Sequence, residues 1–171
     1  MTKNEKLKTY GFTEKSQILS SIERCCDIFG NGSTNAAKVM IEKTIKHETH
    51  FGEFPDKHRK TGEGLSQFDE PTFDWVIKKL TTDTDYKDDI ELLYKYYGID
   101  IFNVTYQNLR FNLDLQSFLT RMKYKFVPSA FPIDDLGQYE YYKKHWNSSK
   151  GDATYEKWVQ DTKNCFFKVG D

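Results

Sequence analysis

Glu48 is the residue whose position most directly suggests chemistry. The pattern predicts a helix over 33–50, and at about 100° per residue Ile41 and Ala37 lie only about 20° to either side of Glu48. The carboxyl thus lies on the stripe expected to face the core, near the helix end, where burial should raise its pKa. An acid that stays protonated near neutral pH suits glycoside cleavage. The alternative is a surface carboxylate paired with Lys43 or Lys46.

The loop 51–68, which follows Glu48, carries a second group of candidate residues. It contains three glycines and one proline, and connections longer than about 12–15 residues in compact domains are usually functional. Gly62 and Gly64 allow a backbone to approach a ligand closely. The amide of Gln67 can donate to and accept from the hydroxyl or N-acetyl groups of a sugar. We therefore expect Gln67 and the Ser66 hydroxyl to bind substrate.

Helices are predicted almost throughout the chain, and they must position these side chains. The other predicted helices cover 13–29, 85–97, 114–126, 134–146 and 153–167, together with a helix from Asp69 through Leu80 and a weaker segment at 103–111. The sequence therefore predicts an all-α fold in a single domain of residues 1–171. A small β-hairpin fits within 51–68, and residues 1–12 are expected to form a mobile or loosely packed segment.

Composition narrows the class of protein. Hydrophobic residues make up 37% of the chain, and 13 Phe, 11 Tyr and 3 Trp can bury large areas, so a packed core is expected. The 25 Lys and Arg balance 26 Asp and Glu, so the basic excess of a nucleic-acid-binding protein is missing. No apolar run approaches the roughly 20 residues of a membrane span, and no secretory signal is recognised near Met1. We expect a monomer that binds neither nucleic acid nor membrane.

Cysteines and histidines indicate no disulfide framework and no metal site. The three cysteines are expected to be buried, reduced thiols: Cys25, Cys26 and Cys165, the last within the final predicted helix. His47 and His50 are three residues apart, whereas the His-Glu-x-x-His zinc motif needs four. A zinc hydrolase that also uses His58 is the alternative. We predict no metal and no cofactor.

Three short segments follow one another in a suggestive order. They are His47-Glu48-Thr49-His50-Phe51, Gly64-Leu65-Ser66-Gln67, and His145-Trp146-Asn147 with Gly151 after it. Together they resemble the lysozyme superfamily, particularly lytic-transglycosylase and goose-type lysozyme domains. Those domains have a catalytic Glu at a helix end, then Gly-Leu-Met-Gln, then Ala-Tyr-Asn near a glycine. The resemblance spans about 34–160, and the departures are Thr49 for Ser, Ser66 for Met and His145-Trp146 for Ala-Tyr.

The resemblance implies cleavage of the β-1,4 bond between N-acetylmuramic acid and N-acetylglucosamine in peptidoglycan. Glu48 would be the general acid and base, and Gln67, Ser66 and Asn147 would contact the sugar. Tyr142 and Trp146 would offer their rings to the flat faces of sugars. For these two aromatic residues the alternative is core packing, and for Asn147 it is a role in ending the helix.

A short wall-degrading enzyme without a signal peptide resembles a bacteriophage lysis enzyme. Such an enzyme stays in the host cytoplasm until it is released to the cell wall. A virion-associated enzyme that opens the wall during infection fits the same motifs equally well.

Two further alternatives stay open. His47-Glu48-Thr49 also resembles the acid-bearing segment of plant-type chitinases, and the second carboxylate of such a hydrolase would be Glu53 or Asp56. Water would then attack the sugar, whereas without a second carboxylate the substrate's own hydroxyl would give an anhydro product. The alternative from another class is a non-catalytic structural or wall-binding protein with a lysozyme-like fold.

Overall fold

The computed structural model describes residues 14–53, 62–147 and 151–170, and these residues are mainly α-helical. The helices are α2 (Lys15–Phe29), α3 (Ala36–Thr49), α4 (Glu70–Thr82), α5 (Lys87–Tyr97), α6 (Leu113–Lys125), α7 (Asp135–Tyr142) and α8 (Tyr155–Thr162). Shorter turns are η2 (Ser33–Asn35), η3 (Thr84–Tyr86), η4 (Ile101–Asn103), η5 (Tyr106–Arg110) and the π-helical η6 (Lys143–Asn147). The predicted all-α fold is confirmed, and the prediction for residues 1–12 lies outside the described residues.

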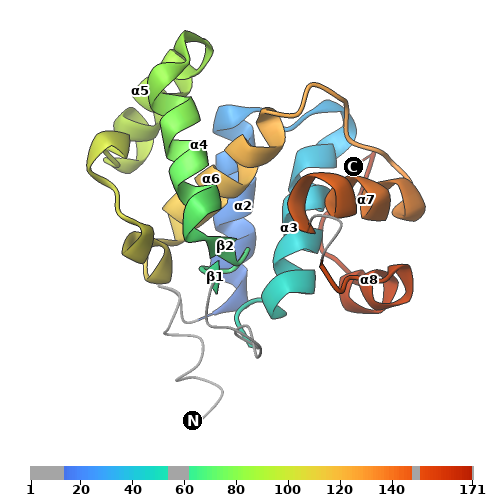
Figure 1. Ribbon diagram of the computed structural model, residues 1–171. Coiled ribbons are helices and arrows are strands. Elements are labelled where there is room, and N and C mark those ends of the chain that lie inside the picture. The colour runs from blue at the N-terminus through green and yellow to red at the C-terminus, as the bar shows by residue number, and fades with distance from the viewer. Residues whose placement is uncertain (1–13, 54–61, 148–150, 171) are drawn as a thin grey trace.

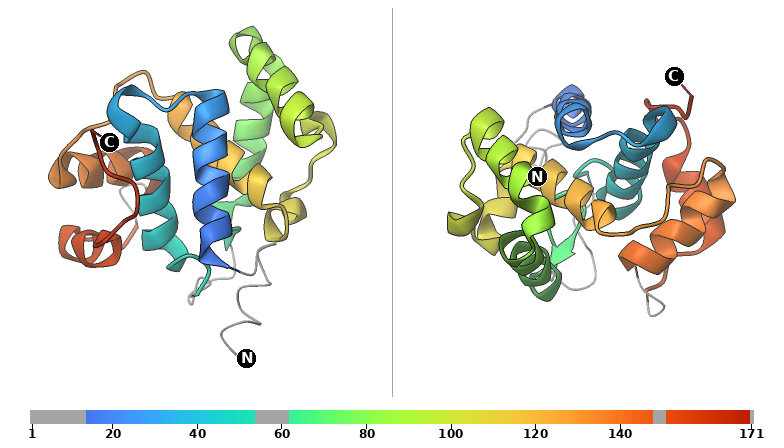
Figure 2. Two further views of the ribbon diagram at one scale, coloured as in Figure 1. Left: turned by 180° about the vertical axis from the view of Figure 1, so that it is seen from behind. Right: turned by 90° about the horizontal axis from the view of Figure 1, so that it is seen from above.

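Helix α6 runs through the middle of the molecule and contacts α2, α3 and α4 (Figure 1). On one side α4 packs with α5, and on the other α3 packs with α8, which also contacts α7 (Figures 1 and 2). In the described part of the chain no helix is both long and apolar enough to cross a bilayer. Helix α6 joins the side formed by α4 and α5 to the side formed by α3 and α8, and it can present side chains to both.

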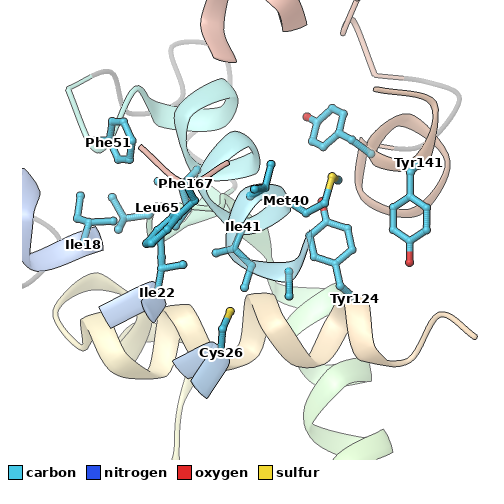
Figure 3. Packing of buried hydrophobic residues seen from close by; sticks show 14 of the residues in the cluster. Ile18, Ile22, Cys26, Met40, Ile41, Phe51, Leu65, Tyr124, Tyr141 and Phe167 are labelled. Carbon is cyan, nitrogen blue, oxygen red and sulfur yellow. The ribbon is translucent and has the colours of Figure 1, made fainter. Parts of the chain in front are cut away.

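Two clusters of buried apolar side chains hold these helices together. In the first, Ile22 of α2, Ile41 of α3 and Tyr124 of α6 pack together (Figure 3). In the second, Phe29 and Phe118 meet between α2 and α6 with ring centroids 4.8 Å apart. Each fully buried side chain of this size contributes about 1.5–3 kcal/mol. All three cysteines are free and buried.

Helix α3 is enclosed on nearly every side, which its sequence pattern does not predict. Its buried polar side chains are Lys38, Glu42, Lys43, Thr44, His47 and Thr49. The apolar stripe of α3 is covered by α2 and α6. Helix α8 and the C-terminal segment, residues 163–170, cover much of the remaining surface. Glu48 is half-buried and is therefore one of the more exposed residues of this helix.

The small hairpin predicted within 51–68 is present, and its second strand extends one residue further. Strands β1 (Gly62–Glu63) and β2 (Phe68–Asp69) are antiparallel, with Gly62 opposite Asp69 and Glu63 opposite Phe68. Thr49 at the end of α3 donates a hydrogen bond through Oγ1 to the Leu65 carbonyl, at 2.9 Å. The hairpin is thereby held against the helix that carries Glu48.

Three predicted helices differ from the structure. The helix predicted over 134–146 is α-helical only to Tyr142 and continues as a π turn, and segment 103–111 forms 3-10 turns. The helix predicted over 153–167 ends at Thr162, so Cys165 lies beyond it. The backbone N–H groups of Phe166 and Phe167 bind the buried Glu42 carboxylate, and this tertiary contact replaces the last helical turn.

Candidate active site

Four segments that are distant in the sequence meet at a pocket of about 220 Å³. It is lined by Glu48, Gly62, Gln67, Phe68, Asp69, Thr72, Lys123, Trp146 and Asn147. These residues come from the end of α3, the hairpin and start of α4, helix α6 and the π turn after α7. The structure thus brings together four residues singled out from the sequence: Glu48, Gln67, Trp146 and Asn147.

Glu48 is held by a neighbouring tyrosine. The Tyr142 hydroxyl donates to Glu48 Oε1 at 2.6 Å, and it accepts a hydrogen bond from Asn147 Nδ2 at 3.2 Å. Burial, and then the charge of Glu48, raise the pKa of Tyr142 far above its ordinary value, so this hydroxyl remains a donor. A donor at this oxygen favours the ionised carboxylate. The raised pKa expected for Glu48 stays a prediction.

The lysines proposed as alternative partners of Glu48 bind other groups. Lys43 donates to Asp135 Oδ1 at 2.5 Å and to Gln138 Oε1 at 2.6 Å. Lys46 donates to the backbone carbonyl of Lys163. The alternative of an ion pair between Glu48 and either lysine is therefore not favoured, because both lysines bind groups of α7 or of the segment after α8.

Gln67 occupies a strained position in the hairpin. Its φ of 51° lies in the left-handed region, and its Nε2 donates to the Gly64 carbonyl at 2.8 Å. Its Oε1 is buried and has no hydrogen-bond partner among the described residues. Because an unpaired buried acceptor costs about 1–3 kcal/mol, this atom is suited to a hydrogen bond from a ligand in the pocket.

Side chains of α6 form hydrogen bonds to the hairpin turn that carries Gln67. Gln116 Oε1 accepts a hydrogen bond from the Leu65 backbone N–H at 2.8 Å. The Ser66 hydroxyl is buried and shares a hydrogen bond of 2.8 Å with Thr120. Ser66 therefore fixes the turn and does not line the pocket, so its predicted side-chain contact with substrate does not occur in this arrangement. Its small side chain permits the close approach to α6.

Trp146 closes another wall of the pocket. Its indole Nε1 donates to the Ser66 carbonyl at 3.2 Å, and its ring meets Phe68 edge to face with centroids 5.2 Å apart. Its ring also packs on Tyr124 at 5.1 Å. Trp146 is half-buried and combines core packing with a position at the pocket, whereas Tyr142 is fully buried and offers Glu48 its hydroxyl in place of a ring face.

Two charged residues of the pocket were not singled out from the sequence. Lys123 lies with its Nζ 3.9 Å from the centroid of the Trp146 ring, and its pKa is lowered to about 8 by burial. Asp69 is exposed and caps α4, accepting the Thr72 backbone N–H at 2.8 Å. A signal existed for Lys123, which lies four residues after Leu119 and three before Phe126, on the apolar side of its helix.

Of the two carboxylates proposed as partners of Glu48, Glu53 is the one that the structure describes. Glu53 is half-buried after the end of α3 and is not among the described residues that line the pocket. Asp56 lies outside the described residues. Among the described residues, the carboxylates that line the pocket are Glu48 and Asp69.

The two described histidines near Glu48 turn away from the pocket. His47 Nδ1 lies 2.8 Å from Asp161 Oδ2, and His50 Nε2 lies 3.2 Å from Asp161 Oδ1. Burial lowers the pKa of His47, although Asp161 opposes this effect. Within the described ranges no group of three or more His, Cys, Asp or Glu side chains is arranged to hold a metal ion. His58 lies outside those ranges.

Two larger pockets lie elsewhere. One of about 720 Å³ lies between α3, α7, α8 and the C-terminal segment, and one of about 680 Å³ lies between α2 and the start of α6. In the first, Lys43 is already bound to Asp135 and Gln138, and in the second, Asp114 is bound to Ser21 and Arg24. The smaller pocket is the better candidate because a held carboxylate, an unpaired amide oxygen and a partly desolvated lysine converge there.

Comparison of the chain with protein-family models, curated proteins and solved structures found no match. The function proposed below therefore rests on the geometry of the Glu48 pocket and on the sequence motifs that converge there.

Proposed function

We propose that the protein is a peptidoglycan-degrading enzyme that cleaves the β-1,4 bond between N-acetylmuramic acid and N-acetylglucosamine. Glu48 is its general acid and base. The observation that carries the proposal is the convergence of Glu48, Gln67, Trp146 and Asn147, from three distant segments, on one pocket. Each side chain has a role in glycoside cleavage: a proton donor, two amides that can bind sugar substituents, and an aromatic wall.

The reaction begins with proton transfer from Glu48 to the bridging oxygen of the scissile bond. The bond from this oxygen to C1 breaks as positive charge develops at C1. Glu48 is left as a carboxylate, and the Tyr142 hydroxyl, 2.6 Å from Oε1, stabilises that charge. Sugar rings covering the pocket exclude water, which favours the protonated acid before transfer.

Two outcomes are open to the sugar cation. In the transglycosylase reaction a hydroxyl of the same sugar attacks C1, Glu48 takes the proton of that hydroxyl, and an anhydro product forms. In the hydrolase reaction water attacks, and a second carboxylate assists. Asp69 lines the pocket and is a further candidate for this role, beside Glu53 and Asp56. Carboxyl separations of about 5–5.5 Å and about 6.5–9.5 Å distinguish a nucleophile from a water-activating base.

The test is muropeptide release from purified sacculi by the wild-type chain and by Glu48→Gln. This substitution keeps size and polarity but removes the transferable proton, so release should fall about 10²–10⁴-fold. The control is Glu140→Gln, which changes an exposed carboxyl on α7 and should leave release unchanged. Mass spectrometry of the products separates anhydro ends from reducing ends.

Retention of full activity by Glu48→Gln would contradict the catalytic role of Glu48. If the wild-type chain sediments with sacculi but releases no muropeptides, the non-catalytic wall-binding alternative is favoured. Release from chitin but not from sacculi favours the chitinase-like alternative. The biological setting, lysis from the host cytoplasm or wall penetration by a virion, belongs to the same proposal and needs localisation in infected cells.

A further inference from the structure

Lys123 is a charged residue of the pocket to which the reaction above assigns no role. It emerges from α6 close to its C-terminal end and is partly buried. Of the described residues that line the pocket, three are charged, and the other two are Glu48 and Asp69. A lysine loses hydration free energy when it is placed among aromatic rings, so its presence at this position calls for a physical explanation.

The ammonium of Lys123 is held in place by two aromatic rings. Its Nζ lies 3.9 Å from the centroid of Trp146 and 5.7 Å from that of Phe68. Such cation–π contacts are attractive, and they strengthen as water is excluded. Trp146 is itself fixed by its hydrogen bond to the Ser66 carbonyl. The positive charge therefore has a defined position at the pocket.

The charged groups that Lys123 faces are carboxylates on two other elements. Burial lowers the pKa of Lys123 to about 8, while the charges of Glu48 on α3 and Asp69 on β2 act in the opposite direction. Uncharged polar groups described at this site include the Tyr142 hydroxyl, the Thr72 hydroxyl and the amides of Gln67 and Asn147. Among the described residues that line the pocket, Lys123 is therefore the cation. Because its pKa is about 8, most Lys123 side chains are protonated near pH 7.

Binding of an anionic substrate group is the less favoured role for this lysine. While Glu48 is protonated, the charges of Asp69 and Lys123 balance, so the described pocket offers no net positive charge to an additional anion. An existing carboxylate that gains and loses charge during the reaction is the better electrostatic partner. Glu48 is such a group, because it becomes negative whenever it gives up its proton.

We infer that Lys123 is a positioning residue for Glu48, whose negative charge it stabilises after Glu48 has transferred its proton to the glycosidic oxygen. The proton passes from a Glu48 carboxyl oxygen to the bridging oxygen, and the leaving sugar departs as an alcohol. The carboxylate that remains is stabilised from α7 by the Tyr142 hydroxyl and from α6 by the Lys123 ammonium. The inference rests on the proposed function of Glu48.

The experiment compares the titration of Glu48 in the wild-type chain and in Lys123→Met. Carboxyl carbons of ¹³C-labelled Glu are followed by NMR, and Glu48 is assigned as the signal missing from Glu48→Gln. Without the ammonium, the midpoint of Glu48 should rise by about one pH unit, because loss of an opposite charge at the same pocket raises the pKa of a carboxyl. In the pH profile of muropeptide release, the alkaline limb, where activity declines, should move to higher pH by the same amount.

Three further variants complete the design. Lys123→Gln supplies a second uncharged side chain in case Lys123→Met does not fold, and Lys123→Arg keeps the cation and should restore the wild-type limb. Lys144→Met removes a lysine charge at an exposed position and should shift neither the midpoint nor the limb.

The possible results distinguish failure of the inference about Lys123 from failure of the proposed function. An unchanged Glu48 midpoint in both uncharged variants overturns the role of Lys123, even in an active enzyme. A higher KM with an unmoved alkaline limb also overturns it, because Lys123 would then contact substrate. No muropeptide release by the wild-type chain overturns the proposed function instead, and the NMR midpoint still reports whether Lys123 acts on Glu48.

Discussion

Tyr142 and Lys123 reach the same carboxylate from different helices. The Tyr142 hydroxyl contacts Glu48 directly, whereas Lys123 acts through its charge. Both side chains are desolvated, so the energy needed to hold them at the pocket reduces the stability of the fold. Functional sites commonly have this property, because groups arranged for chemistry are seldom arranged for maximum stability.

At the scale of the residue, Lys123→Met should make the protein more stable at pH 7. The pKa of Lys123 falls from 10.5 to about 8 on folding, so between these values the unfolded chain binds more protons. Wild-type stability should therefore rise from pH 8 to pH 10.5, and the full cost of the buried charge is present below pH 8. At 1.36 kcal/mol per pKa unit, the fall from 10.5 to about 8 corresponds to a gain of about 3 kcal/mol.

Urea unfolding at pH 7 and at pH 10.5 measures this gain. The difference between Lys123→Met and wild type should shrink at the higher pH, where the wild-type lysine is neutral in the folded state and about half protonated in the unfolded chain. Lys144→Met, at an exposed position, serves as the control. Equal stability of Lys123→Met and wild type at both pH values would contradict the prediction.

At the scale of the element, two irregular segments position the site. The hairpin holds Gln67 in a left-handed conformation, and the π turn that continues α7 places Asn147 five residues after Tyr142, within hydrogen-bond distance of its hydroxyl. A π turn is uncommon and often marks a functional site. The helical spacing of apolar residues does not predict the conformation of these two segments, because neither is an α-helix.

Gly62→Ala should impair the pocket through the hairpin. A Cβ at this position would lie 2.8 Å from Gln67 Oε1 and 2.9 Å from Gln67 Cβ, so Gln67 must move. A shift of about 1 Å in a positioned group can cost about 10²-fold in rate, and we expect a loss of this order in muropeptide release. Overpacking should also lower stability by about 1–3 kcal/mol.

Gly98→Ala is the matched control for that substitution. Gly98 ends α5 with a φ of 65°, and nothing lies within 4 Å of a Cβ built there. Alanine is strained in this conformation and should lower stability by about 1 kcal/mol, but muropeptide release by the folded protein should be unaffected. Equal effects of the two substitutions on release would mean that Gln67 has no positional role.

At the scale of the whole molecule, the C-terminal segment completes the enclosure of α3. The Glu42 carboxylate is buried and accepts the backbone N–H groups of Phe166 and Phe167 at 2.7 and 2.8 Å. Asp161 of α8 meets His47 and His50 on the same side of the molecule. The helix that carries Glu48 is thus also fixed by contacts whose residues do not line the pocket.

Glu42→Ala should therefore lower the free energy of unfolding by about 2–4 kcal/mol, because two buried N–H groups lose a charged acceptor. Glu42→Gln keeps one acceptor oxygen and should cost less. Urea unfolding measures both, with the exposed Glu140→Ala as the control. A loss no larger than that of the control would show that the C-terminal segment is held by other contacts.

Local signals in the sequence predict most of the helices and the principal residues of the pocket. The helix predicted from Asp69 begins at Glu70 with Asp69 as its cap, and the helix predicted over 85–97 ends at Tyr97, because caps and apolar spacing depend on near neighbours in the chain. The short motifs around Glu48, Gln67 and Asn147 select residues that the structure brings to one pocket. The end of the last helix and the π turn are missed, because contacts with distant residues determine them.

The sequence by itself determined the mainly helical character of the chain and the candidate residues at its pocket. Only the tertiary structure decided that α3 is enclosed on nearly every side, that Ser66 faces α6, and that Lys123 and Asp69 join Glu48. The physical reason is that helical periodicity reports which side of an element is apolar. The charge that faces a buried carboxyl depends on which elements pack against it, and that depends on the whole fold.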